Sequence, residues 1–163
     1  MPRPSTLLLD TNVWFDNYFG TREDHQASCA LIDLCQETDV DLFIAAVALK
    51  DLYFQIGAEL KRRSRAHDGT LNESTAKAVE EIAWKSTLNV VESATVVPFD
   101  LSDITTARRF HEVHRDFEDD LVLAAAERAG VDYLVTNDRK LIRHAPVAAL
   151  TPSDMLALLK AFE

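Results

Sequence analysis

The chain alternates between short apolar runs and longer segments in which apolar residues recur every three or four positions. A continuous apolar run is typical of a strand buried on both faces, and the three-and-four spacing is typical of a helix with one buried face. Strands are therefore predicted within residues 7–9, 42–47, 94–99, 131–136 and 147–150. Helices are predicted over residues 23–36, 48–61, 72–88 and 118–129, with two more that start near residues 101 and 153. This alternation predicts one α/β domain over residues 1–163, a three-layer α/β/α sandwich around a central, mainly parallel sheet.

Three segments carry turn or cap chemistry rather than apolar periodicity. Residues 10–12, Asp-Thr-Asn, predict a turn directly after the first strand. Residues 61–70 are basic and then turn-like, and they are predicted to form a flexible join between two helices. Gly130 follows the last apolar position of a predicted helix, which is the usual place of a C-cap glycine.

The charge balance narrows the class of protein. Against 17 Lys and Arg residues stand 27 Asp and Glu residues, a formal net charge of −10. Phosphate binding depends on Lys and Arg, so this excess argues against a protein that coats nucleic acid generally but leaves room for a local basic patch. With 47% apolar residues, no apolar run long enough to span a membrane and no signal peptide, the chain is predicted to be soluble and cytoplasmic.

Glycine and cysteine positions exclude several kinds of site. Gly20, Gly57, Gly69 and Gly130 lie too far apart for a dinucleotide-binding fingerprint, a P-loop or the nucleophile elbow of a hydrolase. Cys29 and Cys35 lie in one predicted helix, so they suit neither a disulfide framework nor a zinc knuckle. Both are predicted to be buried, reduced thiols.

Five aspartates occupy the positions where a parallel sheet would gather them. Asp10 and Asp138 each follow a predicted strand, and Asp51, Asp119 and Asp120 each lie near the start of a predicted helix. Each taken singly is explained by helix capping or turn formation. Taken together they would repel one another at one rim of the sheet, a cost that a bound divalent cation removes.

An all-carboxylate donor set predicts the kind of metal and the kind of reaction. Carboxylates and waters suit Mg²⁺ or Mn²⁺, whereas Zn²⁺ prefers His or Cys among its ligands. Such a metal can lower the pKa of a bound water and neutralise charge on a phosphodiester. The pattern therefore favours phosphodiester hydrolysis.

The segments that carry these aspartates resemble, in order, the four motifs of the PIN domain, and among PIN proteins those of the VapC-type toxins. The matching segments are residues 7–13, 44–52, 116–126 and 133–138, and residues 150–156 resemble the last strand and helix of that family. The resemblance implies an endoribonuclease dependent on Mg²⁺ or Mn²⁺. Its catalytic acidic quartet maps onto Asp10, Asp51, Asp119 and Asp138, with Asp10, Asp119 and Asp138 as metal ligands and with Asn12 and Thr136 as polar support.

Two positions depart from the family pattern. Asp51 stands where the family usually has Glu, so its reach is one methylene shorter and a water-mediated contact or a weaker site is implied. Asp120 stands where a small residue is common, and it is interpreted as either a spare ligand or a charge favoured by the start of a helix. The alignment favours Asp119 over Asp120 as the ligand.

The resemblance also implies partners. These are an RNA substrate, an antitoxin protein whose tail covers the active site, and a second copy of the chain in a homodimer. The competing hypothesis is a catalytically weak or inactive PIN-like module that binds RNA or protein, favoured by Asp51 and by the acidic composition. A phosphomonoesterase is a third possibility.

Other acidic or histidine motifs fit less well. His111 and His114 are three residues apart, whereas the helical zinc motif of metalloproteases needs a separation of four. A phosphatase of the haloacid dehalogenase type would need an acid in place of Asn12. A response-regulator receiver would pair two acids after the first strand and place a Lys after the last, and neither is present.

Basic and aromatic clusters could serve a nuclease or be ordinary structure. Basic residues cluster in residues 61–65, at Arg108 and Arg109, and at Arg139, Lys140 and Arg143. They are candidates for phosphate contacts, with a solvated surface as the alternative. Trp14, Phe15, Tyr18 and Phe19 are expected to pack mostly in the core, with a groove for a partner segment as the alternative.

Overall fold

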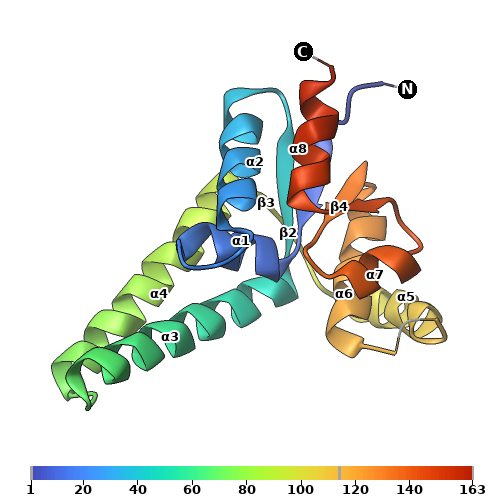
Figure 1. Ribbon diagram of the computed structural model, residues 1–163. Coiled ribbons are helices and arrows are strands. Elements are labelled where there is room, and N and C mark those ends of the chain that lie inside the picture. The colour runs from blue at the N-terminus through green and yellow to red at the C-terminus, as the bar shows by residue number, and fades with distance from the viewer. Residues whose placement is uncertain (1, 114, 163) are drawn as a thin grey trace.

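The computed structural model describes residues 2–113 and 115–162 (Figure 1). Over these residues the strands are β1 (Thr6–Leu9), β2 (Asp41–Ala45), β3 (Thr95–Val97), β4 (Tyr133–Val135) and β5 (Ala149–Leu150). The helices are α1 (Thr11–Tyr18), α2 (His25–Glu37), α3 (Ala46–Asp68), α4 (Glu73–Ser93), α5 (Leu101–His111), α6 (Phe117–Ala129), α7 (Arg139–His144) and α8 (Pro152–Lys160). Strands and helices alternate as the apolar pattern predicts, and the fold class is α/β.

The strands form one parallel sheet in the order β3-β2-β1-β4-β5. β1 is central, and its residues Leu7, Leu8 and Leu9 are fully buried because helices cover both faces. The chain moves outward from β1 to β3 and then returns to the other side of β1 to form β4. In sheets of this kind, ligands bind beyond the carboxyl ends of the strands where the order reverses, here between β1 and β4.

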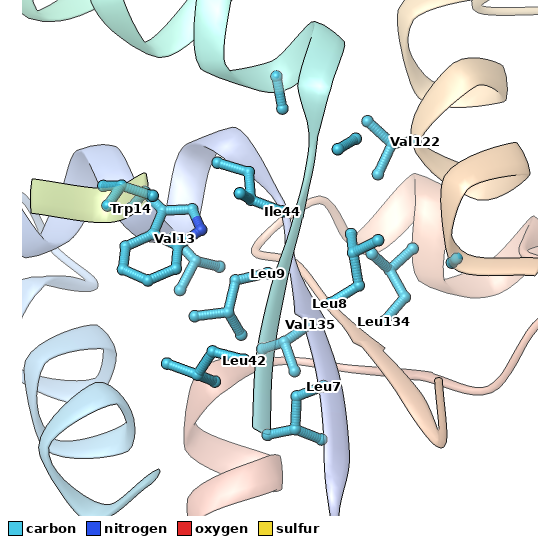
Figure 2. Packing of buried hydrophobic residues seen from close by; sticks show 14 of the residues in the cluster. Leu7, Leu8, Leu9, Val13, Trp14, Leu42, Ile44, Val122, Leu134 and Val135 are labelled. Atoms are coloured by element: carbon cyan, nitrogen blue, oxygen red, sulfur yellow. The ribbon is translucent and has the colours of Figure 1, made fainter. Parts of the chain in front are cut away.

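Two helical layers enclose the sheet. α2 and α8 cover one face, and α6 covers the other with α5 packed against its outer side (Figure 1). Successive side chains of β1 point to opposite faces of the sheet. Figure 2 shows Leu9 beside Val13 on one face and Leu8 beside Leu134 on the other. The architecture is therefore the predicted α/β/α sandwich.

The turn predicted at residues 10–12 is wrong, because α1 begins directly after β1. Asp10 is the N-cap of this helix, and its Oδ1 accepts a hydrogen bond of 2.7 Å from the backbone N–H of Thr11. Asp, Thr and Asn are favoured in turns and at helix starts for the same reason, since their side chains bond to nearby backbone groups. The buried Val13 and Trp14 then hold α1 against the core.

The flexible join predicted at residues 61–70 is also wrong. α3 continues to Asp68 and ends at Gly69, whose φ of 73° gives a left-handed cap. With α4 it forms a helical arm that projects from the body (Figure 1). The extension lacks apolar periodicity, and its helical form is supported by bonds from Arg62 and Arg63 to Glu59.

α7, like α1, is a helix that the sequence reading omits. It follows Asp138 directly, spans Arg139–His144 and buries Leu141. A helix this short shows no apolar periodicity. At the other end of the preceding strand, Gly130 closes α6 in the left-handed conformation, so the predicted cap is confirmed.

Polar side-chain contacts join α5 to α6 near both ends. Arg128 of α6 donates to the buried Asp103 at the start of α5, with Nε to Oδ1 at 2.9 Å. His111 at the end of α5 contacts the buried Asp120 of α6, with Nδ1 to Oδ2 at 2.7 Å. These contacts fix the rotation of α6, which carries Asp119.

Cys29 and Cys35 are both free; Cys35 is buried as predicted, whereas Cys29 is half-buried. In the described part of the chain, no helix combines the length and apolar character needed to cross a membrane.

Two glycine substitutions are expected to change stability in opposite directions. Gly130→Ala should lower the free energy of unfolding by about 1–2 kcal/mol, since Gly130 has a φ of 62°. Gly57→Ala, inside α3, should raise it by about 0.5–1 kcal/mol, because the added Cβ would lie 3.9 Å from Ala83 Cβ, an ordinary contact. Urea denaturation of both variants tests this, and equal signs would contradict it.

Candidate active site

A pocket of about 330 Å³ lies beyond the carboxyl ends of the strands, where β1, α3 and α6 meet. Its acidic lining comes from Asp10 after β1, Asp51 in the second turn of α3, and Glu118 and Asp119 in the first turn of α6. We refer to this space as the acidic pocket. Three of the four predicted catalytic acids therefore line one cavity, although they come from distant parts of the sequence.

Asp10 is almost fully buried, and hydrogen bonds hold both of its oxygens. While Oδ1 caps α1, Oδ2 accepts from Thr136 Oγ1 at 2.7 Å and from Asn12 Nδ2 at 2.8 Å. Burial raises the pKa of Asp10, the charge of Asp138 raises it further, and these hydrogen bonds oppose the rise. Asn12 and Thr136, predicted as polar support, therefore both donate to the Asp10 carboxylate.

Asp138 lies beside the acidic pocket, at the start of α7. Its Oδ1 accepts from the backbone N–H groups of Lys140 at 2.7 Å and Leu141 at 3.1 Å, and its own N–H donates to Thr136 Oγ1 at 3.0 Å. The Asp138 carboxylate is therefore the N-cap of α7, in agreement with the helix-capping role that explains each aspartate when it is considered singly. It is also close enough to raise the pKa values of both Asp10 and Asp119.

Asp119 lies in the first turn of α6, and its pKa is also raised. Burial, together with the charges of Asp10, Asp116, Asp138 and Asp120, raises the pKa of Asp119 to about 7. A carboxyl group with this pKa is poised between its protonated and ionised forms at neutral pH, which is common at functional sites.

Asp51 lines the acidic pocket but is paired with its neighbour. The Lys50 ammonium lies 2.9 Å from Asp51 Oδ1, and this contact raises the pKa of Lys50. Lys50 and Gln55 also line the pocket, and neither is predicted as a site residue. Lys50 places one positive charge among the acids. Its position next to Asp51 in the sequence does not reveal this, because neighbouring residues on a helix usually point in different directions.

Asp120 is directed away from the acidic pocket. Its side chain is fully buried between α6 and α5, where it contacts His111, so its position favours a structural role over that of a spare ligand. His111 therefore serves the α5–α6 contact, and His114 lies outside the described residues.

A second layer of polar contacts supports the site and is missed by the sequence reading. The buried Asp16 of α1 accepts from Asn137 Nδ2 at 2.8 Å and from Arg22 Nε at 2.6 Å. The backbone N–H of Asn137 in turn donates to Asn12 Oδ1 at 3.0 Å. One signal was available: Asp16 lies three residues after Val13, so a helix over this segment would place the aspartate on the same face as that apolar residue.

The aromatic residues of α1 are mostly packed, as expected. Trp14 and Phe19 are buried, while Phe15 and Tyr18 are partly buried against the core. Tyr18 donates its hydroxyl to the Ser86 carbonyl at 2.9 Å. These side chains join α1 to its neighbours.

The donor set fits a hydrated Mg²⁺ or Mn²⁺ ion. Among residues 2–113 and 115–162, no three Asp, Glu, His or Cys side chains converge closely enough to form a preformed cage. Mg²⁺ in proteins is commonly held by one or two carboxylates and several waters, and does not need such a cage. Burial is the main cause of the raised pKa values of Asp10 and Asp119, and the charges of neighbouring carboxylates add to it, a repulsion that a cation would relieve.

Comparison with known proteins gives a family match and a set of similar folds. A family model described as the PIN domain matches residues 6–140. Comparison with curated proteins gives no significant match.

Three solved structures illustrate the similarity. FitAB bound to an IR36 DNA fragment has a TM-score of 0.65 at 18% identity, covering 90% of this chain and 95% of that chain. VapBC2 from Rickettsia felis bound to a DNA fragment from its promoter has a TM-score of 0.64 at 12% identity, covering 90% and 98%. VapC20 from Mycobacterium tuberculosis, described as a sarcin-ricin loop cleaving toxin, has a TM-score of 0.51 at 14% identity, covering 78% and 86%. At these identities the likeness shows a shared fold.

Asp119→Asn is expected to stabilise the metal-free protein at high pH but not at low pH. Between the ordinary carboxyl pKa of 3.8 and about 7, the unfolded chain releases a proton that folded Asp119 retains. The free energy of unfolding of the wild-type protein therefore falls as pH rises through this window. After allowance for partial solvation, the substitution should add about 1–3 kcal/mol at pH 8 and almost nothing at pH 4.

Urea denaturation in EDTA across this pH range measures the effect. The matched control is Asp33→Asn, an exposed position on α2. A stability difference that does not depend on pH would contradict the expectation.

Proposed function

The chain belongs to the PIN domain family, and from this premise we propose that it is a metal-dependent endoribonuclease that hydrolyses RNA phosphodiester bonds. The observation that carries the proposal is the acidic pocket beyond the carboxyl ends of β1 and β2, which Asp10, Asp51 and Asp119 line. Natural folds avoid gathering like charges without compensation, because each carboxylate raises the pKa of the next. A site that accepts this repulsion is suited to a cation and to a phosphate held by that cation.

Each predicted residue has a role that agrees with its surroundings. Asp10, Asp119 and Asp138 would hold Mg²⁺ or Mn²⁺, which when bound neutralises phosphate charge and makes water more acidic. Asn12 and Thr136 orient Asp10 by donating to its Oδ2. Asp51 would position the attacking water or accept its proton, and the Lys50 ammonium next to it can face the phosphate.

We further infer that the chain is the toxin of a toxin–antitoxin pair. The support lies in the similar structures: FitAB and VapBC2 are bound to DNA, and VapC20 is described as a toxin that cleaves the sarcin-ricin loop. An antitoxin protein and a homodimer are proposed as partners on the same ground. Static light scattering that gives only the 18.3 kDa mass of one chain would contradict the homodimer.

A second candidate function is a binding module without catalytic activity. The Lys50–Asp51 ion pair favours it, because this pair occupies one of the four predicted catalytic carboxylates. Such a module would bind RNA or a protein but would cleave no RNA with any divalent cation. A phosphomonoesterase would instead hydrolyse a generic aryl phosphate, and no such turnover is expected.

Purified protein is expected to cleave a structured RNA in Mn²⁺ or Mg²⁺ and to stop when EDTA is added. Asp10→Asn should slow cleavage at least about 100-fold, because it removes the charge of a carboxylate at the metal centre. The substitution nearly preserves shape, so circular dichroism and the melting temperature report whether the fold survives. Asp33→Asn, exposed on α2, is the matched control and should cleave like the wild type.

Two outcomes would overturn the proposal. Cleavage by Asp10→Asn at the wild-type rate would exclude Asp10 from the chemistry and point to a contaminating nuclease. RNA binding without cleavage in either metal would leave the binding module as the better description.

A further inference from the structure

A second groove, of about 680 Å³, adjoins the acidic pocket and lies between α5 and the start of α6. Its apolar lining comes from Ile104 and Ala107 of α5 and from Phe117, the first residue of α6. Phe117 also lines the acidic pocket, so this one side chain borders both cavities. We refer to this second cavity as the α5 groove.

Phe117 presents a large ring to solvent at this boundary. Its side chain is 57% exposed, although it follows directly after the N-cap Asp116 and could have been polar at no cost to the helix. An exposed aromatic ring in a groove is a platform on which a nucleobase can stack, and such stacking is tolerant of base identity.

Two arginines border the same groove. Arg108 and Arg115 line it, and within the described residues neither forms an ion pair. Arg109 on the same helix behaves differently, since it is paired with Glu127 of α6. Among the described residues of the lining Glu112 is the one carboxylate, so the two arginines give this part of the groove a positive excess on a chain whose net charge is −10.

We propose that the α5 groove binds the nucleotide next to the phosphate that is cleaved in the acidic pocket. Its base lies against Phe117 and Ile104, and its phosphate lies between Arg108 and Arg115. The exposed Phe117 ring can stack on a flat nucleobase, and the guanidinium groups of Arg108 and Arg115 can bind the neighbouring phosphate through paired hydrogen bonds. This inference rests on the proposed ribonuclease function and adds the place where the substrate strand leaves the site.

The test is RNA binding measured apart from cleavage. A fluorescein-labelled single-stranded RNA of about ten nucleotides is titrated in Mg²⁺ with protein carrying Asp10→Asn, and anisotropy gives the dissociation constant. Phe117→Leu should weaken binding by about 5–30-fold. Arg108→Gln should weaken it by about 3–10-fold and flatten its salt dependence, because one phosphate contact is lost.

Two controls make the result specific. Arg3→Gln removes an exposed cation just before β1, at the edge of the sheet opposite both cavities, and should change binding less than about twofold. An RNA of the same length with abasic sites should bind Phe117→Leu and its parent equally, because no base is left to stack. Phe117 is exposed, so Phe117→Leu should fold normally, which circular dichroism checks.

The outcomes separate this inference from the function on which it rests. If the wild type cleaves RNA but Phe117→Leu and Arg108→Gln bind it as tightly as their parent, the α5 groove is not the subsite and only this inference fails. If the wild type neither cleaves nor binds RNA, the proposed function fails and this inference with it. If Phe117→Leu converts a dimer into a monomer in light scattering, the groove is a contact between copies of the chain, and the inference is again overturned.

Discussion

The contact between Asp10 and Thr136 is the constraint on which the site depends. It joins the ends of β1 and β4, which are 126 residues apart in sequence, through one 2.7 Å hydrogen bond in a fully buried position. The same threonine hydroxyl accepts from the N–H of Asp138, so a single side chain fixes two of the acids relative to each other. Loss of this contact would leave a buried carboxylate short of one donor, which is costly in a protein interior.

The parallel sheet and its polar edge could be predicted from the sequence, because each depends on short-range signals. Leu7, Leu8 and Leu9 form a continuous apolar run only because β1 is covered on both faces. Once parallel strands are inferred, their carboxyl ends must share an edge, so Asp10 and the residues around Asp138 are brought together by topology alone.

What the sequence reading missed depends on contacts that carry no periodic signal. The outer half of α3 is mostly exposed and is supported by ion pairs from Glu59 and by packing on α4, so its residues look like a basic loop. The side chain of Asp10 can accept a hydrogen bond from a nearby backbone N–H either in a turn or as the N-cap of a helix. Only the φ and ψ angles of the residues that follow distinguish the two. The Lys50–Asp51 pair and the Asp16–Asn137 bond depend on side-chain rotamers and on tertiary neighbours, which the order of residues does not specify.

The pocket contains two acids, Asp10 and Asp119, whose charges are treated differently by their surroundings. Asp10 is buried but well bonded, so part of the cost of its charge is offset within the protein. Asp119 faces several carboxylates, and its pKa is raised to about 7. The pocket therefore contains one acid with a fixed orientation and one acid whose charge responds to what enters, which is a suitable division for a site that must both hold and release a charged ligand.

The length of α3 has a mechanical consequence. The helix begins at the pocket and continues to Asp68, so it is about 34 Å long, and Asp51 lies in its first quarter. When a rigid rod pivots at its root, a displacement at the far end reaches a point a quarter of the way along reduced about fourfold. A tilt of the arm that moved its far end by several ångströms would therefore move the carboxylate near its base only about a quarter as far.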